Sequence, residues 1–486
     1  MPISFNEIPD VKEPGIFAEI DNSGALSGLA GKESVMLVIG RKTDDGTAAV
    51  EKPVEISVKG EEADSLFGAG SEAARMIAAV RKNNTFNRLF CIPLANSTGT
   101  AAEQTITLTV DNPKSGAVYL YIAGRRIAVD VTTASTAETL AEAIAAAINV
   151  KTETPVTAAA ADGVVTCTAK CKGLSGNGID YRLNYNAGET TASGVSVVFA
   201  EKTAGANNPD LTSVIAVLAD TYYTGIVCPY TDAANLALMR AELERRFGAM
   251  VRVESSLYLG IKGTMSAMQT ASAATNCPHF FYIEAYKTPD APEERAAALM
   301  GVAEYNAQID PARQLKTLEL KGCLPPETGD GLIYEERNLL IKSGISTTTE
   351  SGGKVLISRV VSNYTKNAFG TADASYMDWT TIKTLIYLRY SYVARFAQKF
   401  PRHKLADDSY VVKDGQAIVT PTVAKAEAIA LANDWLDAGL IENLDDFKAS
   451  IVSERNANDT ERLDQLLKPD IINNLRVVAG KIQFKL

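Results

Sequence analysis

The order of apolar and polar residues predicts an α/β core built from two pieces of the chain. Residues 31–97 contain the apolar strand "SVMLVIG", the helix "SEAARMIAAVRKN" and a second strand, "RLFCIPL". Residues 204–370 continue this alternation, with strands such as "HFFYIEA" and helices such as "APEERAAALMGVAEYNAQ". Apolar strands that alternate with helices are typical of a parallel sheet covered on both faces. We therefore expect one core made from both pieces.

The stretch between these two pieces has a different pattern. Short strands rich in Thr and Val, among them "QTITLTV" and "GVSVVFA", fill most of residues 98–203. One helix interrupts them at "STAETLAEAIAAAIN", where Ser135 and Glu138 have the spacing of a capping box. The pattern predicts a strand-rich domain that is inserted into the core.

Both ends of the chain differ from the core. Residues 1–30 are rich in Pro and Gly and predict an extended linker arm. Residues 371–486 predict an α+β domain, beginning with a long helix that Pro401 ends. After a second helix come the strand-like "FKASIVSER", a polar connection, a short helix at "ERLDQLL" and a closing strand at "LRVVAGKIQFKL".

The closing strand alternates apolar and polar side chains, as a strand with one buried face does. A segment near the other end, "GIFAEID", is a second short strand of this kind. Neither has an obvious partner nearby in the sequence, so we expect each to add to a sheet of a neighbouring copy. Such an exchange is heterologous and builds rings or helical filaments. The residues expected to take part are Ile16, Phe17, Ala18, Ile20, Val478, Ile482, Phe484 and Leu486.

Composition narrows the range of partners. Lys and Arg total 48 against 58 Asp and Glu, and the formal charge of −10 argues against nucleic acid. No apolar run approaches the ~20 residues that span a bilayer, and the first residues lack the regions of a secretory signal. We expect a cytoplasmic protein without membrane insertion. Its six cysteines are too sparse for a disulfide scaffold and are expected to be reduced and mostly buried.

One stretch runs against the acidic composition. No acidic residue occurs between Trp379 and Ala406, and on a helical wheel Arg395 and Lys399 lie nearly opposite the apolar face. Charge runs are usually solvated faces, but this one also fits a patch offered to an acidic partner, and the pattern alone favours neither. The candidates for such a patch are Lys383, Arg389, Arg395, Lys399 and Arg402.

The sequence contains little that could carry catalysis. Its two histidines are His279, at the start of an apolar strand, and His403, in the basic "FPRHKL". There is no G-x-S-x-G elbow and no nucleotide-binding loop. The spacing of Cys167 and Cys171 is not followed by a second pair, so a structural zinc site is not expected. We predict no enzyme activity, no cofactor and no metal.

The chain resembles the contractile tail sheath proteins of Mu-like phages along essentially its whole length. The resemblance rests on the order of several segments: "PGIFAEIDNSGAL", "LFGAGSEAARMIAAVRKNNTFNRLFCIPL", "AVYLYIAGRRIAVDV", "KVLISRVVSNYTKNAFGTADASYMDWTTIKTLIYLRYSYVARFAQKFPRHKLADD" and "LRVVAGKIQFKL". No single motif among them is diagnostic. Their order and total coverage carry the match.

This resemblance implies a fold and a set of partners. The α/β core would be subtilisin-like without a catalytic triad, the inserted domain would project outward, and the C-terminal domain would face the tail tube. Residues 13–21 and 475–486 would be the exchanged strands, with Phe447 and Ile451 in the acceptor sheet. The basic helix near Arg395 would grip the tube. The partners would be other copies in stacked rings, expected to be hexameric, the tube protein, and the baseplate and tail terminator proteins.

The same resemblance implies a mechanism. The sheath would assemble around the tube in an extended, metastable state in the host cytoplasm. On the virion tail it would contract and drive the tube through the host envelope for genome delivery. Two other functions stay open from the residues alone: an enzyme of α/β hydrolase type, and an adhesin whose binding lies in residues 98–203.

Overall fold

The structure is a computed structural model, and it describes residues 29, 31–413 and 415–485. The chain divides into two compact units, which we call the large unit and the small unit. Each has its own apolar core. The large unit contains Glu33–Ile386 with Asn474–Leu486, and the small unit contains Met1–Lys32 with Tyr387–Asn473.

Helix α9 (Trp379–Lys399) belongs to both units. The domain boundary that we predicted at residue 371 stays a prediction; the two compact units divide between Ile386 and Tyr387, inside this helix. The physical reason is that Trp379 is buried in the core of the large unit. The last thirteen residues, Asn474–Leu486, also cluster with the large unit.

An eight-stranded sheet lies at the centre of the large unit, in the order β15-β14-β13-β12-β11-β1-β3-β2. The strands from β14 to β3 are parallel, and one antiparallel strand closes each edge. Strands β1 and β13 are buried along their whole length, as the apolar runs in the sequence indicated. The strands are β1 (Val35–Arg41), β2 (Val54–Ile56), β3 (Arg88–Leu94), β11 (Gly225–Val227), β12 (Ser256–Ile261), β13 (Phe280–Glu284), β14 (Ile345–Ser351) and β15 (Lys354–Arg359).

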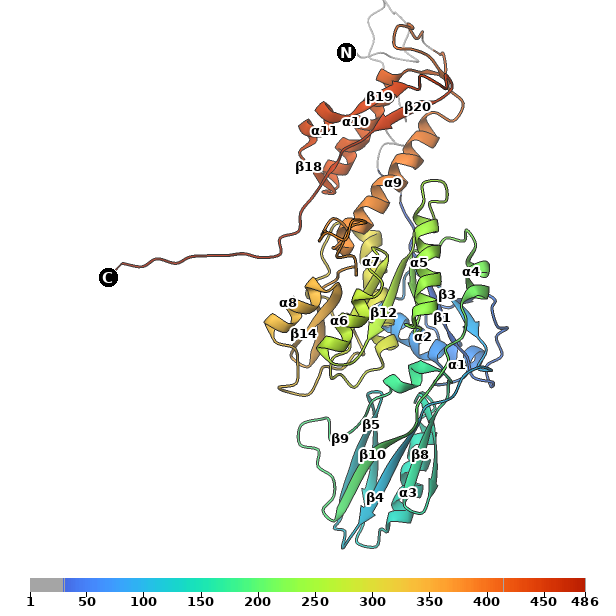
Figure 1. Cartoon of the computed structure of the whole chain (residues 1–486), viewed down its shortest axis with the longest axis vertical. Coiled ribbons are helices and arrows are strands. Elements are labelled where there is room, and N and C mark those ends of the chain that lie inside the picture. The colour runs from blue at the N-terminus through green and yellow to red at the C-terminus, as the bar shows by residue number, and fades with distance from the viewer. Residues whose placement is uncertain (1–28, 30, 414, 486) are drawn as a thin grey trace, which may run out of the picture. The chain divides into compact units, whose positions relative to one another are not determined.

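Helices cover both faces of this sheet (Figure 1). Met76 of α2 and Leu299 of α7 share an apolar cluster with Met36 of β1 on one face. Helices α4, α5, α6 and α8 contribute side chains to the cluster on the other face. The chain is therefore of the α/β class. The helices are α1 (Ala63–Phe67), α2 (Glu72–Asn83), α4 (Thr212–Leu218), α5 (Ala233–Phe247), α6 (Met265–Ala273), α7 (Pro292–Ile309) and α8 (Tyr334–Lys342).

The insert is a sandwich of two sheets with one helix, α3 (Ala137–Val150). One sheet has the order β10-β4-β8-β7 and the other the order β6-β5-β9. The capping box of α3 is formed by Thr136 and Thr139, one residue later than the predicted pair, Ser135 and Glu138. The strands are β4 (Glu103–Val110), β5 (Gly116–Ile122), β6 (Arg125–Val131), β7 (Val156–Ala161), β8 (Val164–Ala169), β9 (Tyr181–Leu183) and β10 (Val195–Thr203), and a 3-10 helix covers Leu174–Gly178.

The small unit packs the second part of α9 with two further helices and three pairs of short strands. Trp435 is buried and donates its indole N–H to Ser391 Oγ of α9 at 2.9 Å. The elements are α10 (Pro421–Asp437), α11 (Leu444–Ser450), and the pairs β16 (Lys404–Leu405) with β17 (Ile418–Val419), β18 (Ile441–Glu442) with β21 (Asp470–Ile471), and β19 (Val452–Arg455) with β20 (Leu463–Leu466).

A buried ion pair fixes the start of α9 to the large unit. Lys383 Nζ lies 2.6 Å from Glu304 Oε1 of α7, and both side chains are almost fully buried. Tyr258 donates to the same carboxylate at 2.8 Å and accepts from the indole of Trp379 at 2.9 Å. Burial opposes ionisation of Glu304, but the nearby ammonium and the hydrogen bonds lower its pKa below the usual value.

We predict that Lys383→Met strongly destabilises the large unit, because it leaves the Glu304 charge buried without a cation. The expected loss is about 3–5 kcal/mol in the free energy of unfolding, measured by hydrogen exchange of large-unit amides in urea. The double variant Lys383→Met with Glu304→Gln should recover part of this loss. The control is Lys354→Met in the exposed pair with Glu319, where about 0–1 kcal/mol is expected. Equal stabilities of the Lys383 and Lys354 variants would contradict the prediction.

Candidate assembly surfaces

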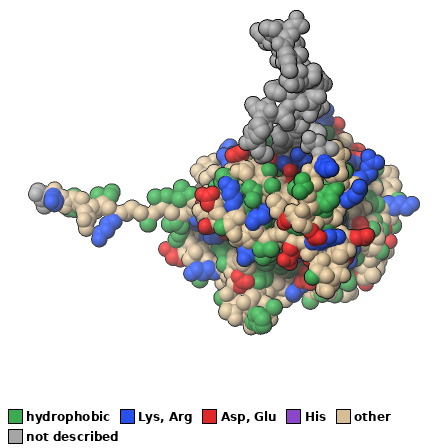
Figure 2. Space-filling model, turned by 90° about the horizontal axis from the view of Figure 1, so that it is seen from above, with side chains coloured by type: hydrophobic (Ala, Val, Ile, Leu, Met, Phe, Trp, Pro, Cys, Tyr) green, Lys and Arg blue, Asp and Glu red, His purple; other side chains and the backbone are tan. Residues whose placement is uncertain are grey.

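The closing segment has no strand partner within the described residues of its own chain. Residues 472–485 carry no strand or helix. Along this tail Val477, Val478, Ile482 and Phe484 are at least 74% exposed, and apolar side chains are visible along it in Figure 2. We predicted a strand here with one apolar face. The residues that would form that face are unpaired and in solvent.

The base of the tail is held by polar contacts to the large unit. Arg476 Nη2 lies 2.9 Å from Asp378 Oδ1, and the other oxygen of Asp378 binds Arg359 at 2.9 Å. Gln314 donates to the carbonyl of Leu475 at 3.0 Å, and Asn474 donates to Thr380 Oγ1 at 3.1 Å. The free part of the tail therefore begins after Arg476.

The hairpin formed by β19 and β20 is a sheet with open edges. Val452 lies opposite Leu466, and Glu454 lies opposite Asp464. Each strand has one neighbour among the described residues, so each keeps one edge with unpaired N–H and C=O groups. Asn456 closes the turn, because its side-chain oxygen accepts from the main-chain N–H of Asn458 and Asp459.

Two predictions about this region are wrong. Phe447, expected in the acceptor sheet, lies in helix α11, and Ile451 is the residue that ends this helix; both are buried. Two acidic residues in the first turn, Asp445 and Asp446, favour the helix. The strand-like part of this stretch is limited to β19. The predicted helix at "ERLDQLL" is instead strand β20, because the turn at Asn456 folds it back onto β19.

The predicted basic face of α9 is largely paired within the protein. Lys383 is buried against Glu304, as described above. Arg395 is 8% exposed and forms ion pairs with Glu427 at 3.0 Å and with Asp434 of α10. Burial works against the charge of Arg395, but the hydrogen bonds to these two carboxylates raise its pKa. Lys383 and Arg395 are therefore structural residues and not parts of a free surface.

The other basic candidates lie nearer the surface. Arg389 is half-buried, and Lys399 is exposed with its ammonium 4.0 Å from Glu427. Arg402 is exposed just after the helix, and so is Lys404. Arg402, Lys404 and Lys413 form no ion pair with another described residue. The exposed cations thus concentrate at the end of α9 and beyond it.

The sequence pattern did not predict the exposed apolar side chains that follow these cations in the chain. Tyr410 is 46% exposed and Val411 79% exposed. The two acidic residues that precede them are engaged elsewhere: Asp407 pairs with Arg455 at 3.1 Å, and Asp408 accepts the N–H of Thr422 at 2.8 Å. The only signal in the sequence was "YVV" between turn-forming residues. We call residues 399–413 the basic tip.

The remaining candidates for chemistry are ordinary structural residues. His279 is buried with its ring 4.8 Å from that of Phe247, and His403 is exposed against Phe400. All six cysteines are free thiols. Among the described residues no group of three or more His, Cys, Asp or Glu could hold a metal ion. No helix in the described part of the chain is long and apolar enough to span a membrane.

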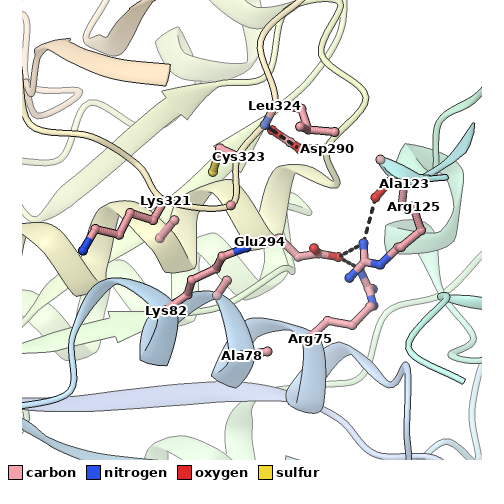
Figure 3. Close-up of a pocket in the computed structure, with 14 residues that line it drawn as sticks. Arg75, Ala78, Lys82, Ala123, Arg125, Asp290, Glu294, Lys321, Cys323 and Leu324 are labelled. Atoms are coloured by element: carbon pink, nitrogen blue, oxygen red, sulfur yellow. Dashed lines mark hydrogen bonds and ion pairs between the residues drawn. The ribbon is translucent and has the colours of Figure 1, made fainter. Parts of the chain in front are cut away.

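A cavity of about 230 Å³ lies between α2, α7 and the insert. Figure 3 shows Arg75 and Arg125 pointing at the carboxylate of Glu294, with Arg125 at 3.0 Å. Asp290 lines the same cavity, and burial raises its pKa to about 6, although Arg295 and the N–H of Leu324 act in the opposite direction. The acidic groups of the cavity are paired with neighbouring cations, which is the arrangement of a structural ion-pair cluster.

Some of the residues that we predicted to take part in strand exchange lie outside the described residues. Ile16, Phe17, Ala18 and Ile20 lie outside them, as does Leu486. Their part in strand exchange stays a prediction.

Comparisons with known proteins point to one family. The model of the phage tail sheath protein central domain matches residues 204–362, and that of the phage tail sheath C-terminal domain matches residues 371–485. The Mu-like prophage FluMu tail sheath protein of Haemophilus influenzae is 35% identical over 487 residues, covering 100% of both chains.

Two solved structures of sheath proteins are similar to this chain over most of its length. The sheath tail protein of Desulfitobacterium hafniense has 12% identity and a TM-score of 0.48, covering 94% of this chain and 100% of that one. The anti-feeding prophage helical sheath in the contracted state has 10% identity and a TM-score of 0.48, covering 97% of this chain and 99% of that one.

We predict that the Asp290 carboxyl makes stability depend on pH between about 4 and 7. Its pKa in the folded protein, about 6, lies above the value of 3.8 expected for an unperturbed Asp. The protonated form is therefore favoured by folding, and this contribution is lost as the pH rises through 6. Relative to Asp290→Asn, the wild type should lose roughly 2–3 kcal/mol over this range. Urea unfolding at a series of pH values measures this difference, and a constant difference would contradict it.

Proposed function

This chain belongs to the phage tail sheath family and is a Mu-like tail sheath protein, a structural subunit and not an enzyme; from this premise we propose how it assembles and works. Copies of the chain polymerise around a tail tube as stacked rings, joined by strands exchanged between neighbours. The polymer then contracts from a metastable extended state and drives the tube through the host envelope during genome delivery. The observation that carries this proposal is that the described chain contains both an unpaired, apolar tail and a hairpin with open edges.

The tail and the hairpin both have unpaired main-chain groups and exposed apolar side chains. From Val477 to Lys485 the tail has no described main-chain hydrogen bond, and its apolar face is in solvent. The hairpin of β19 and β20 offers open edges with exposed Val452 and Leu466. An added strand would gain main-chain hydrogen bonds, each contributing about 0.5–1.5 kcal/mol net, and would cover the exposed apolar side chain of the strand that it joins.

Charge also supports this pairing. The tail from residue 475 contains three basic residues and no acidic one, namely Arg476, Lys481 and Lys485. On the hairpin, Glu454 stands directly opposite Asp464. Asp464 is already paired with Arg462 at 2.6 Å, so Glu454 is the acidic side chain with which a cationic strand added beside β19 would pair. The hairpin therefore replaces Phe447 and Ile451 as the proposed acceptor. Residues 13–21 are proposed as a second exchanged strand on the sequence pattern alone.

The basic tip is the proposed tube-facing surface. Its exposed cations, Lys399, Arg402, Lys404 and Lys413, surround apolar side chains, so it suits an acidic surface with an apolar patch. Exposed charge pairs contribute a few tenths to about 1 kcal/mol each. A set of such contacts can hold the extended state and still be released on contraction. Baseplate and tail terminator proteins are the proposed partners at the two ends of the polymer.

The proposed contraction draws on the free-energy difference between two packings of the same subunits. The sequence has no nucleotide-binding loop, so the energy is stored when the extended polymer forms. The protein is a component of the virion tail; we propose that its assembly takes place in the host cytoplasm. The 35% identity extends over the insert as well, and it gives no support to a separate adhesin.

We predict that the last strand is required for assembly. A variant ending at Asn474, and a full-length variant with Ile482→Glu and Phe484→Glu, should stay small when mixed with the tube protein. The wild type should form hollow tubes, as seen by negative-stain electron microscopy. The control, Ala479→Ser with Gln483→Ser, changes the opposite face of the strand and should assemble normally. Tubes formed equally well by the truncated chain would show that the strand is dispensable.

We predict that charge reversal on the basic tip weakens binding to the tube. Arg402→Glu with Lys404→Glu should raise the Kd for the tube protein by at least about tenfold, which corresponds to roughly 1.4 kcal/mol. Co-sedimentation with preformed tubes at two salt concentrations measures the effect, which should shrink at high salt. The control is Lys448→Glu, an exposed lysine of the same unit that pairs with Asp445. If this control weakens binding as much as the double variant, the tip is not the tube-facing surface.

A further inference from the structure

The carboxyl ends of β1 and β11 mark the place where an α/β sheet usually binds a ligand. These strands are neighbours, but the helix after β1, α2, covers one face and the helix after β11, α5, covers the other. In open α/β sheets such a change of face leaves a crevice at the carboxyl ends of the two strands. In this protein the residues at that point are Arg41, the last of β1, and Tyr230, shortly after β11.

The insert fills this crevice with its own main chain. The guanidinium of Arg41 is fully buried and donates to the carbonyl of Lys172, to the carbonyl of Asn207 at 3.4 Å and to Thr98 Oγ1 at 3.2 Å. These three partners lie where the chain leaves the core, in the insert and where the chain re-enters the core. The charge of Arg41 is therefore stabilised by the segments around Thr98, Lys172 and Asn207, which join the insert to the core. We call these segments the neck of the insert.

A buried carboxylate makes the complementary contact. Glu72, the first residue of α2, is fully buried and accepts from the N–H of Arg41 at 2.9 Å and from Tyr230 Oη at 2.7 Å. Its other oxygen accepts from Ser175 Oγ of the insert. A buried charge that loses a hydrogen-bond partner is strongly destabilised. The Arg41 side chain thus depends on the insert and its junctions with the core for its hydrogen bonds, and Glu72 depends on the insert for one of its three.

The neck also approaches the core too closely for side chains at two positions. A Cβ on Gly70, just before α2, would lie 2.2 Å from the carbonyl oxygen of Thr154 in the insert. A Cβ on Gly173 would lie 3.4 Å from the Arg41 guanidinium and 2.9 Å from Asn208 Oδ1, with φ at +109°. Glycine at position 70 lets the main chain of the core pack directly against a main-chain carbonyl of the insert, and glycine at position 173 adopts a positive φ next to two side chains of the core.

Contacts at two further places join the insert to the core outside the crevice. Arg125 of β6 shares the Glu294 carboxylate with Arg75 of α2, and this cluster is drawn in Figure 3. Lys262, after β12, lies 3.4 Å from Asp180 of the insert, and Tyr185 donates to the carbonyl of Pro325 at 2.8 Å. The insert is thus held to the core at three separate places.

We infer that the insert closes the ligand crevice of the α/β core and folds with the core as one cooperative body. The insert is a structural part of the core. It is not a domain that could be deleted without unfolding the core or that moves independently of it. A crevice filled by the chain itself has no room for a substrate at this point of the sheet. One consequence rests on the proposed function: during contraction, the insert and the core move together.

The test destabilises the insert mildly and asks whether the core responds. Ile144 is buried inside the insert, away from the crevice, and Ile144→Val is expected to be tolerated. If the two parts are one body, amides of β1 and β3 in the core should exchange faster by the same factor as amides of β5 and β8 in the insert. The expected factor is about three- to tenfold, measured by hydrogen exchange of the full chain in low urea. The matched control is Ile451→Val in the small unit, which should leave both sets unchanged.

A second variant tests the contact itself. Glu72→Gln with Ser175→Ala removes the charge and the hydroxyl that meet in the crevice, and should reduce the coupling between insert and core amides. Faster exchange confined to the insert in Ile144→Val, with core amides unchanged, would overturn the inference. Neither measurement involves polymerisation or tube binding, so failure here is distinguishable from failure of the proposed sheath function.

Discussion

The need to pair main-chain N–H and C=O groups is the constraint on which this structure depends most. In the eight-stranded sheet every inner strand has two neighbours, and an antiparallel strand finishes each edge. At the carboxyl ends of β1 and β11, carbonyls of the neck receive the donors of Arg41. The same requirement is left unmet at the tail and along the hairpin of β19 and β20. Within the described residues the chain pairs the main-chain groups of its core sheet, and in the proposed assembly the tail and the hairpin would pair with a second chain.

The pairing of buried charges follows the same logic. Lys383 and Arg395 come from a stretch that looks uniformly basic, but each meets acidic side chains from distant parts of the sequence. Burial makes an unpaired charge costly, so the fold keeps the charges in its interior matched and exposes the others. The exposed cations of that stretch therefore lie at the end of α9 and beyond it. The surface that can meet an acidic partner is smaller than the sequence suggests, and it includes apolar side chains.

The α/β class and the division of the core into two pieces could be predicted because long apolar runs such as Val35–Arg41 have few alternatives. The start of α2 was equally clear, since Ser71 caps it. Short stretches were harder to predict. Leu463 and Leu466 fit either a helix or a strand, and the turn at Asn456 decided the outcome. The partners of Lys383 and Arg395 could not be seen because Glu304 and Glu427 are distant in sequence. The closing of the crevice by the insert depends on contacts between main chain and side chains, which leave no periodic signal.

In the proposed polymer, the two-residue repeat of the tail would fix the spacing between subunits. A shift by one residue would turn Ile482 and Phe484 away from the sheet that receives them, and a shift by two would move the neighbouring subunit by roughly 7 Å. Intermediate spacings leave hydrogen bonds unpaired. A polymer joined in this way cannot shorten by a gradual sliding of its joints. In the proposed contraction, its length would therefore change by rotation of whole subunits about joints that keep their register.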